Sequence, residues 1–473
     1  MKIMMFGFDG LRPDCVTQDV MPNLYSFLEK NCECSNARSV FPSETYVNHP
    51  TIFSGFLPEQ HGLIANAFYD TSVSRKDFFL GSIVERIEEA ERMTQGNLYE
   101  VPTLSETLAA NNRSYISVSS NSPGSTRLMA HKSETLGQIN ISVNGFAYAV
   151  PSVLKEKYGS DKEGNNYERP EVEGLKKMNE VVHDLFETYS MADVNVIWYG
   201  EPDHSFHQFG IGSPEAKKAL EAADGCFGQL LDRYWKDDVQ VIVLSDHGHV
   251  TIEKQFNLTE ELEKRGFVHV ENLLDTTAGG FTLLWGYSGN IYVHHKALIK
   301  DMVYEMQKMD EMGMIFTQDY DGINGALEGT FSKRLVSGDH PRSGDIRYVL
   351  RSEDKIDKWG KKGTCVCHPF LDNGCSIHGG LNENEVHTLL GFGGSAFKKE
   401  HTVNTVTGVL DVTPTIYHLL GITPALPTQG TVISEVLKEK RSISEPVILE
   451  HTYTTRKDSY IQKLTISYKN RIP

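Results

Sequence analysis

The sequence predicts an α/β protein with a doubly wound, mostly parallel sheet and helices on both faces. Four short runs, rich in apolar and β-branched residues, lack polar alternation, which is typical of strands buried on both faces of a parallel sheet. Helical patterns separate these runs, so strand and helix alternate along the chain. The predicted strands are residues 3–8, 115–118, 194–199 and 239–244.

The helices predicted between these strands have recognisable first turns. Pro102 precedes one of them, and Pro214 stands at the first helical position of another, where a missing N–H costs little. The predicted helices are residues 21–29, 103–110, 175–189 and 213–234.

The pattern changes after the fourth strand, and residues 256–370 are predicted to form an inserted cap subdomain. Two short strands, at 281–285 and 290–294, accompany one helix at 297–312 and Gly-rich loops at 322–329. This mixture lacks the regular alternation of the core, so we expect it to form a separate unit.

The core pattern returns after the cap, with a strand at 388–391 and a helix at 411–420. The helix begins Asp-Val-Thr-Pro-Thr, which offers an Asp or Thr N-cap followed by proline. Residues 446–468 alternate apolar and polar, so we expect a hairpin at a sheet edge or an oligomer contact, and through it a homo-oligomer. The expected units are residues 1–255 (first part of the core), 256–370 (cap), 371–440 (second part of the core) and 441–473 (C-terminal β-rich tail).

The composition is that of a globular protein of 473 residues, because 39% apolar and 23% charged residues exclude collagen-like and wholly disordered chains. The formal net charge of −17 disfavours a nucleic-acid coat or an anionic membrane as the main partner. No apolar run approaches the ~18 residues of a membrane span, so we expect no membrane partner.

The cysteines and the N-terminal run predict a cytoplasmic location. The run at 3–8 is too short for a signal peptide and is interrupted by Asp9. Seven cysteines are an odd count in a long chain, which argues against a full disulfide framework. The pairs Cys32/Cys34 and Cys365/Cys367 are alternatively half of a zinc site, although structural zinc spacings favour two to four intervening residues.

Three of the four predicted strands run directly into carboxylates and imidazoles. Ligands bind beyond the carboxyl ends of strands in open α/β sheets, so we expect these groups to meet at one edge. Mixed carboxylate and imidazole ligands suit zinc, and paired metal ions serve phosphoryl chemistry. The groups are Asp9 after the first strand, Glu201, Asp203, His204 and His207 after the third, and Asp246, His247 and His249 after the fourth.

Local spacing indicates which of these groups share an ion. Asp203 and His207 stand four residues apart, so both face one ion if the segment is helical. Asp246 and His247 are adjacent and require a sharp turn at Gly248 to face the same centre. Each group taken alone is equally a solvated strand end or a helix cap.

A nucleophile is predicted in the polar segment around residues 42–49, before a helix-like stretch at 50–54. Ser43 and Thr45 both carry hydroxyls that would gain from a helix N-terminus, although either could serve only as an N-cap. A neutral hydroxyl needs a base or a metal ion to become a good nucleophile.

These segments resemble the nucleotide pyrophosphatase/phosphodiesterase (type I phosphodiesterase) family of the alkaline phosphatase superfamily. The resemblance covers roughly residues 1–250 and 372–435, and it implies an alkaline-phosphatase-like version of the predicted fold. It is carried by Phe41-Pro-Ser-Glu-Thr45-Tyr-Val-Asn-His49, Gly55-Phe-Leu-Pro-Glu-Gln-His61-Gly62, Asn66, Asp9, Asp203-x-x-x-His207, Asp246-His247, His378-Gly379 and the helix at 411–421.

The resemblance implies a two-zinc hydrolase, with Mn²⁺ or Fe as substitutes in the cell. Thr45 takes the nucleophile position and forms a phosphothreonine intermediate, while Asn66 and the Thr45 N–H stabilise the phosphoryl oxygens. The sequence departs from the family at His249, commonly Met, and at Gly380, often aromatic. The implied ligands are Asp203, His207 and His378 for one zinc, and Asp9, Thr45, Asp246 and His247 for the other.

The expected substrate is a small phosphorylated molecule, and the resemblance implies a nucleotide-like one that stacks on Tyr46. Phe68 and Tyr69 flank the predicted centre and either stack on a base or belong to the core. A carbon–phosphorus hydrolase like phosphonoacetate hydrolase is the rival, with Arg127, Lys132 or a lysine of the cap as candidates to hold a substrate carboxylate. A phosphomonoesterase and a metal-stabilised binding protein without turnover are the further alternatives.

Overall fold

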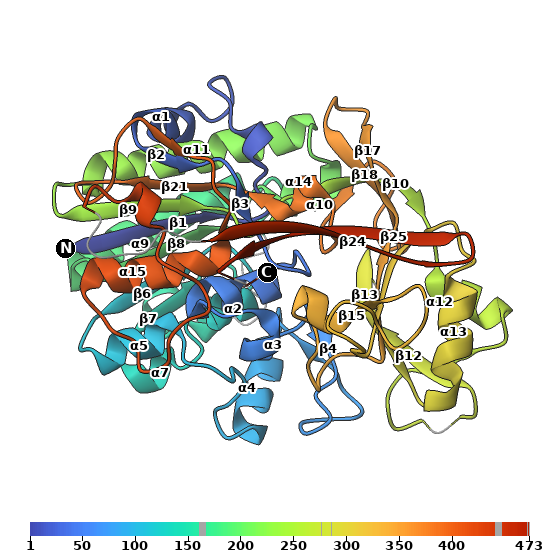
Figure 1. The fold of residues 1–473 in the computed structure, drawn as a ribbon. Helices are drawn as coiled ribbons and strands as arrows, with labels where there is room; N and C mark the ends of the chain where they lie inside the picture. Colours follow the sequence, from blue (N-terminus) through green and yellow to red (C-terminus); the bar gives the residue numbers. More distant parts are fainter. Residues whose placement is uncertain (160–166, 276, 285, 440–446, 471, 473) are drawn as a thin grey trace.

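A central eight-stranded sheet with helices on both faces forms the core of the protein (Figure 1). The computed structural model describes residues 1–159, 167–275, 277–284, 286–439, 447–470 and 472. The sheet order is β22-β2-β21-β9-β1-β8-β6-β7. The five strands from β9 to β7 run parallel, and β21 joins them antiparallel, so the predicted doubly wound, mostly parallel α/β class is confirmed.

The four strands predicted before the cap all form, and β7, which was not predicted, and three edge strands complete the eight-stranded sheet. The parallel strands are β1 (Lys2–Phe8), β6 (Tyr115–Ser119), β7 (Ile139–Ser142), β8 (Val194–Tyr199) and β9 (Val239–Leu244). The edge strands are β2 (Cys32–Cys34), β21 (Leu390–Gly393) and β22 (His401–Val403).

Alternation along β1 distributes its side chains between two cores. Met4 and Phe6 belong to the cluster beneath α1, α9 and α11, whereas Ile3 and Met5 belong to the cluster that includes α2, α5 and α15. Both faces of the strand are therefore buried, which explains its unbroken apolar sequence. These helices are α1 (Pro22–Lys30), α2 (Thr45–Ser54), α5 (Leu104–Ala110), α9 (Val172–Tyr189), α11 (Pro214–Tyr234) and α15 (Val412–Leu420).

The strand predicted at 388–391 is wrong as a single element. Thr388 belongs to β20 (His387–Thr388), which pairs with β3 (Ala37–Arg38), whereas Leu390 begins β21 and pairs with β9. The chain changes sheets at Leu389, a change that an apolar run does not reveal.

The cap consists mainly of a six-stranded sheet, β11-β12-β13-β16-β14-β15, with α12 and α13 beside it (Figure 1). Its strands are β11 (Val268–His269), β12 (Gly280–Leu284), β13 (Ser288–Val293), β14 (Met312–Thr317), β15 (Phe331–Ser332) and β16 (Ile346–Leu350), and its helices are α12 (Leu258–Lys264) and α13 (Ile299–Met306). The predicted strand at 281–285 matches β12, except that residue 285 lies outside the described residues.

The cap helix predicted at 297–312 is too long. Its regular part, α13, ends at Met306, and Met312 already begins β14. Ile315 pairs with Tyr348 of β16, so strand pairing prevails over helical periodicity after the helix.

A four-stranded sheet, β17-β18-β10-β19, connects the cap to the core. Its strands are β10 (Val250–Gln255), β17 (Ser352–Ile356), β18 (Lys362–Cys367) and β19 (Ser376–Ile377). β10 directly follows His249 and β19 directly precedes His378, so this small sheet fixes two candidate ligands.

The tail forms the predicted hairpin, with β24 (Ile448–Lys457) and β25 (Tyr460–Lys469), while residue 446 lies outside the described residues. The hairpin is a separate two-stranded sheet and does not extend the edge of another sheet. It crosses from the core to the cap (Figure 1). At the cap end Gln462 Nε2 donates to Gly329 O, and at the core end Lys469 Nζ donates to Asp411 Oδ2.

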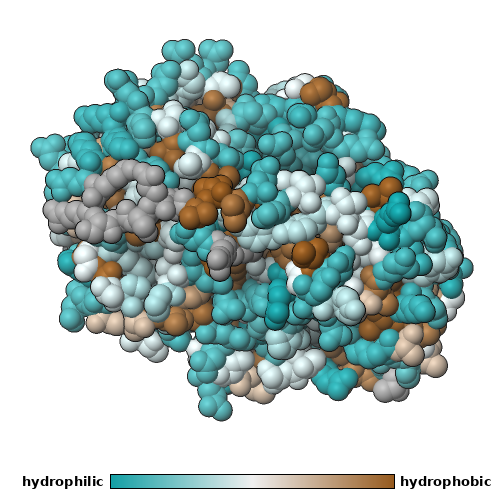
Figure 2. Space-filling model, in the orientation of Figure 1, coloured by the Kyte–Doolittle hydropathy of each residue, from teal (hydrophilic) through white to brown (hydrophobic). Residues whose placement is uncertain are grey.

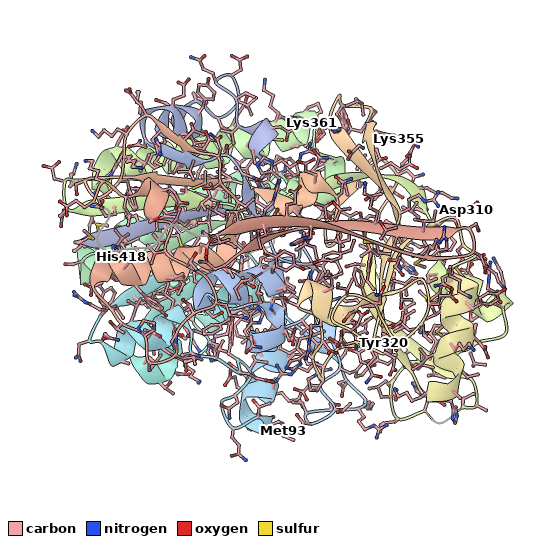
Figure 3. All side chains as sticks on the ribbon, viewed as in Figure 1. Met93, Asp310, Tyr320, Lys355, Lys361 and His418 are labelled. Atoms are coloured by element: carbon pink, nitrogen blue, oxygen red, sulfur yellow. The ribbon has the colours of Figure 1, made fainter. Side chains whose placement is uncertain are left out.

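The surface is polar on the face drawn in Figure 2, where apolar residues form small separate patches. Exposed apolar side chains are also present, and Figure 3 shows one of them, Met93, at the lower edge of the molecule. Within the described part of the chain, no helix is long and apolar enough to cross a membrane.

Candidate active site

Carboxylates and imidazoles from three parallel strands meet at the carboxyl edge of the sheet. Asp9 follows β1, Asp203 begins α10 (Asp203–Phe209) shortly after β8, and Asp246 and His247 follow β9. Because β1 lies between β8 and β9, the three strand ends are adjacent. The predicted convergence of these groups is present in the structure.

Four groups surround one position, which we call the first site and define as Asp9, Thr45, Asp246 and His247. Thr45 Oγ1 lies 3.1 Å from His247 Nε2 and 3.4 Å from Asp9 Oδ1. His247 Nε2 lies 3.6 Å from Asp9 Oδ1 and 3.4 Å from Asp246 Oδ2. Ligands held at about 2.0–2.1 Å by one tetrahedral zinc stand about 3.3 Å apart, so these spacings fit a single ion.

The carboxylates of the first site are held by donors on their outer oxygens. The Asn121 side-chain amide and the Trp198 indole N–H both donate to Asp9 Oδ2, the latter at 3.0 Å. The Gly10 N–H donates to Asp246 Oδ1 at 3.1 Å. These contacts leave Asp9 Oδ1 and Asp246 Oδ2 facing the site, the usual role of partners behind metal ligands.

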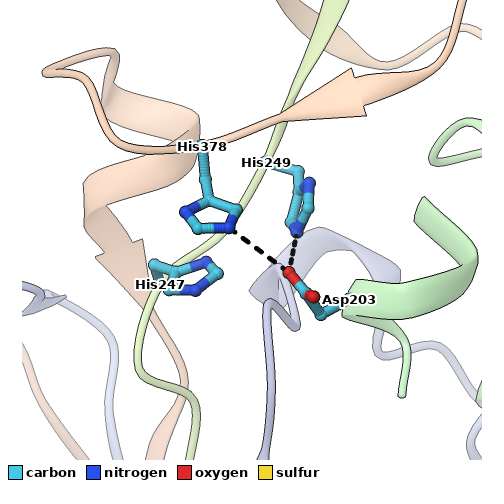
Figure 4. Close-up of side chains that lie close together, drawn as sticks. All are labelled: Asp203, His247, His249 and His378. Atoms are coloured by element: carbon cyan, nitrogen blue, oxygen red, sulfur yellow. Dashed lines mark hydrogen bonds and ion pairs between the residues drawn. The ribbon is translucent and has the colours of Figure 1, made fainter. Parts of the chain in front are cut away.

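A neighbouring position, the second site, lies around Asp203 and contains His207, His249 and His378. Asp203 Oδ1 lies 3.3 Å from His207 Nε2, 3.5 Å from His378 Nε2 and 2.8 Å from His249 Nε2. Figure 4 shows His249 and His378 directed toward this carboxylate, with His247 beside them. Asp203 and His207 share the first turns of α10, as their spacing predicted.

The hydrogen bonds fix the tautomers of three imidazoles. His207 Nδ1 lies 2.9 Å from Ser376 O, His247 Nδ1 lies 3.1 Å from Gly248 O, and His378 Nδ1 lies 2.7 Å from Ser43 O. A carbonyl oxygen only accepts, so each Nδ1 must carry the hydrogen when the ring is neutral. In the neutral rings each Nε2 lone pair therefore points at the carboxylates.

Burial makes this concentration of acceptors unfavourable without a cation. Desolvation raises the pKa of Asp246 to about 8, and desolvation and repulsion from Asp246 raise the pKa of Asp9 well above its usual range. Asp246 Oδ2 is buried and has no hydrogen-bond partner. Lone pairs and carboxylates that face one another with an unpaired buried oxygen fit divalent metal ions.

The proposed nucleophile stands at the N-terminus of α2. Thr45 is the first residue of the helix, is 8% exposed, and gains from the positive end of the helix dipole. The Tyr46 N–H donates to Asn66 Oδ1 at 3.0 Å, so the Asn66 amide nitrogen is the end that can donate to a bound oxygen. Ser43 donates instead to Gly380 O, which separates its role from that of Thr45.

The three aromatic candidates for substrate binding differ in their placement. Tyr46 is partly exposed, and its ring packs against Gly81. Phe68 is fully buried and stacks on Phe79, and Tyr69 is 1% exposed. Phe68 and Tyr69 therefore lie in the core, which is one of the two placements predicted for them.

The two basic candidates outside the cap for holding a substrate carboxylate have other partners. Arg127 Nη2 donates to Tyr148 O at 3.1 Å, and Lys132 Nζ donates to Glu106 Oε1 at 2.6 Å. Arg127 is also 3.5 Å from Glu88, so both cations are paired.

Sequence reasoning missed several residues that hold the site together. His49, one turn after Thr45, places Nε2 3.7 Å from both Asp9 Oδ2 and Asp246 Oδ2. Asn121 and Trp198 are distant in the sequence and have no spacing that identifies them. His249 was visible beside Asp246 and His247 but received no ligand role.

The cysteines do not contribute to either site. All seven lie in the described part of the chain and are unpaired thiols. The potential metal-holding groups found among the described residues contain only Asp and His, namely Asp203, His247, His249 and His378, and Asp9, Asp246 and His247. The zinc alternative for the Cys-x-Cys pairs therefore has no support.

Comparisons with known proteins identify the family of the chain. A sequence profile of the type I phosphodiesterase/nucleotide pyrophosphatase family matches residues 3–356. The bis(5′-adenosyl)-triphosphatase enpp4 of Xenopus laevis is 22% identical over 91% of this chain and 80% of its own length. Ectonucleotide pyrophosphatase/phosphodiesterase family member 3 of Mus musculus is 27% identical, over 52% of this chain and 24% of its own length.

The fold has solved counterparts as well. Murine ectonucleotide pyrophosphatase/phosphodiesterase 5 superposes with a TM-score of 0.64 at 17% identity, over 91% of this chain and 98% of that chain. The human protein of the same name gives a TM-score of 0.64 over 93% of this chain. The profile match covers most of the chain, and the chain belongs to the type I phosphodiesterase/nucleotide pyrophosphatase family, a family of phosphoric ester hydrolases.

Proposed function

We propose that the protein hydrolyses phosphodiester or phosphoanhydride bonds of nucleotide-like substrates, with Thr45 as the nucleophile. The observation that carries the proposal is the position of Thr45 Oγ1, at the first residue of α2 and within 3.4 Å of both His247 Nε2 and Asp9 Oδ1. A hydroxyl in this place meets the requirement for activation by its surroundings.

Two divalent cations, zinc in the simplest case, would be held by Asp9, Thr45, Asp246 and His247 and by Asp203, His207 and His378. When bound, such ions lower the pKa of a hydroxyl and neutralise charge on the attacking and leaving oxygens. Mn²⁺ or Fe²⁺ would suit the same carboxylate and imidazole donors.

The reaction would consist of two successive in-line displacements at phosphorus, in which residues of the chain take part. Thr45 Oγ1 loses its proton, attacks phosphorus and expels the leaving oxygen, which gives a phosphothreonine. Water then attacks the same phosphorus, the bond to Thr45 Oγ1 breaks, and the threonine regains a proton. The Asn66 amide nitrogen and the Thr45 N–H donate to the non-bridging oxygens in both steps.

The substrate proposal rests on Tyr46 and on the names of relatives. The partly exposed Tyr46 ring lies next to the nucleophile and offers a surface on which a base can stack. The Xenopus relative is named for hydrolysis of a bis-adenosyl triphosphate, a dinucleotide with phosphoanhydride bonds. Arg127 and Lys132 are already paired, which weakens the phosphonoacetate alternative.

Two further expectations stay proposals. Seven unpaired thiols support a reducing compartment such as the cytoplasm. Strand β24 of the hairpin, most of whose residues are exposed, would provide the contact for a homo-oligomer.

The nucleophile is tested with Thr45→Ala, and Thr94→Ala at the end of α4 (Val84–Met93) is the matched control. We expect Thr45→Ala to abolish hydrolysis of every substrate while zinc content stays near two per chain, and Thr94→Ala to behave as the wild type. Mass spectrometry of the quenched wild type should find a phosphoryl group on the Thr45 peptide. Unchanged turnover of Thr45→Ala would rule out this nucleophile.

The substrate class is tested by comparing rates on a nucleotide p-nitrophenyl diester, a p-nitrophenyl monoester and phosphonoacetate. We expect the diester to give the highest kcat/KM. A clear preference for phosphonoacetate or for the monoester would overturn the proposed substrate class.

A further inference from the structure

His249 is a buried imidazole at the second site that has no role in the two ligand sets given above. It is fully buried and precedes β10 by one residue. The antiparallel register pairs Val250 with Ile377, so His249 and His378 are the next residues to face each other, and their ring centroids are 5.0 Å apart. The sheet that connects cap and core thus brings His249 to the same carboxylate as His378.

The hydrogen bonds of Ser376 decide which ring nitrogen of His249 carries the hydrogen. Ser376 Oγ lies 2.7 Å from Phe206 O, and only the serine can supply the hydrogen for that contact. The same oxygen lies 3.1 Å from His249 Nδ1, so it accepts from an Nδ1–H. His249 Nε2 is then a bare lone pair, 2.8 Å from Asp203 Oδ1.

Two lone pairs at this distance repel each other unless a positive centre lies between them. The backbone carbonyl of Ser376 accepts from His207 Nδ1, so one residue orients two imidazoles toward Asp203. His249 therefore has the arrangement found for metal-ligating histidines, with one nitrogen fixed by a second partner and the other directed at the ion.

The distance from Asp203 Oδ1 to His249 also differs from its distances to the other two imidazoles. The distances of 3.3 Å and 3.5 Å from Asp203 Oδ1 to His207 and His378 match the about 3.3 Å expected between tetrahedral zinc ligands. The 2.8 Å distance to His249 matches the about 2.9 Å expected for ligands at a right angle around an ion at about 2.05 Å. His249 thus fits an additional coordination position.

We propose that His249 Nε2 is a direct ligand of the ion at the second site, which gives that ion one carboxylate and three imidazoles from the chain. The inference rests on the proposed two-metal function and extends it, because the chain would then offer the second ion four ligands.

The rival arrangement makes His249 a hydrogen-bond donor to Asp203 Oδ1 through Nε2–H. In a neutral ring this requires the Ser376 hydroxyl to turn to His249 Nδ1, which leaves the 2.7 Å contact between Ser376 Oγ and Phe206 O without a hydrogen. The two arrangements predict different positions for the ion and different effects of substitution.

The direct test is a crystal structure of the full chain loaded with Zn²⁺, with anomalous diffraction at the zinc edge. We expect an ion beside Asp203 with His249 Nε2 at about 2.0–2.1 Å. An ion held there by Asp203, His207 and His378, with His249 beyond about 3 Å, would overturn the inference but leave the two-metal proposal intact. Absence of any ion beside Asp203 would overturn both.

Variants provide a second test in solution, by chelator competition that resolves the two zinc affinities. We expect His249→Met and His249→Gln each to weaken the second site by more than roughly 100-fold, the upper end for loss of a partner behind a ligand, with the first site unchanged. His183→Met, in which the replaced imidazole contacts Tyr234 between α9 and α11, is the matched control. Wild-type affinity in His249→Gln, which keeps an amide donor, would favour the rival and overturn the inference.

Discussion

The imidazole rings of His247 and His378 stack, with centroids 3.7 Å apart and an interplanar angle of 20°. His247 follows the core strand β9, and His378 follows β19 in the sheet that leads to the cap. His247 lies in the first site and His378 in the second, so the stack places the two sites next to each other. A displacement of either ring would change both.

Metal removal should destabilise the protein more at high pH than at low pH. An unfolded Asp246 loses its proton near pH 4, whereas burial raises the folded pKa to about 8. Between these values the folded state binds more protons, so the stability of the metal-free protein falls as pH rises. A divalent cation offsets this loss by pairing with the ionised carboxylate.

Calorimetry of metal-free and zinc-loaded protein at pH 5.5 and 8 checks this prediction. Zinc at 100 times its Kd should raise the free energy of unfolding by about 2.7 kcal/mol, so we expect a higher Tm at both pH values. When the same zinc concentration is used at both pH values, the increase in Tm should be larger at pH 8. An increase that is larger at pH 5.5 would contradict the assignment of Asp246 as a ligand.

Trp198→Phe should weaken zinc binding at the first site, although Trp198 is not itself a proposed ligand. The substitution keeps the aromatic packing of β8 but removes the N–H that donates to Asp9 Oδ2 at 3.0 Å. We expect zinc affinity at the first site to fall roughly 10- to 100-fold, the usual cost of losing a partner behind a ligand. Trp235→Phe, whose indole packs on Phe27, should leave zinc affinity unchanged in the same titration.

Asn66→Ala should lower kcat with little change in metal content. The amide nitrogen is proposed to donate to a phosphoryl oxygen, and loss of one such donor typically costs about 10²–10³ in kcat. Asn97→Ala, in the exposed turn after α4, is the control. Equal kcat in Asn66→Ala and the wild type would remove Asn66 from the proposed chemistry.

Gly10→Ala should damage both folding and the second site. Gly10 has φ +67°, and a Cβ there would lie 2.6 Å from His249 Nε2 and 3.0 Å from the Asp203 Cβ. We expect a lower Tm and weaker zinc binding in Gly10→Ala. Gly137→Ala has the same positive φ and no atom within 4 Å of the added Cβ, so it reports the backbone strain alone.

Lys469→Met should loosen the hairpin of β24 and β25 from the core. Lys469 Nζ donates to the buried Asp411 Oδ2 at 2.9 Å, and breaking a buried pair typically costs about 3–5 kcal/mol. We expect a lower Tm and faster proteolytic cleavage near the hairpin. Lys457→Met, which removes an exposed pair with Glu328, should change neither quantity appreciably.

The strands of the core were predictable because burial on both faces leaves an unbroken apolar signal. β1 buries Met4 on one face and Met5 on the other, so its sequence requires no polar position. The element predictions failed where pairing partners decide the outcome, at Met312, which starts a strand, and at Leu389, where the chain changes sheets.

The residues of the candidate site also differ in whether the sequence alone could predict them. Asp9, Asp203 and Asp246 were predictable because strand ends place them, whereas His378 was selected only through the family resemblance. The donors behind the ligands, such as Asn121, depend on packing between remote segments and leave no local pattern. Phe68 is near Thr45 in sequence but faces an aromatic core, because side-chain direction does not follow from proximity along the chain.

The small sheet of β10, β17, β18 and β19 has an architectural consequence. The cap leaves the core just after His249 and returns just before His378, so its two roots stand side by side at the catalytic edge. The strands that position His249 and His378 are therefore also the strands from which the cap extends, so a change in the cap that shifts this sheet would move both imidazoles together.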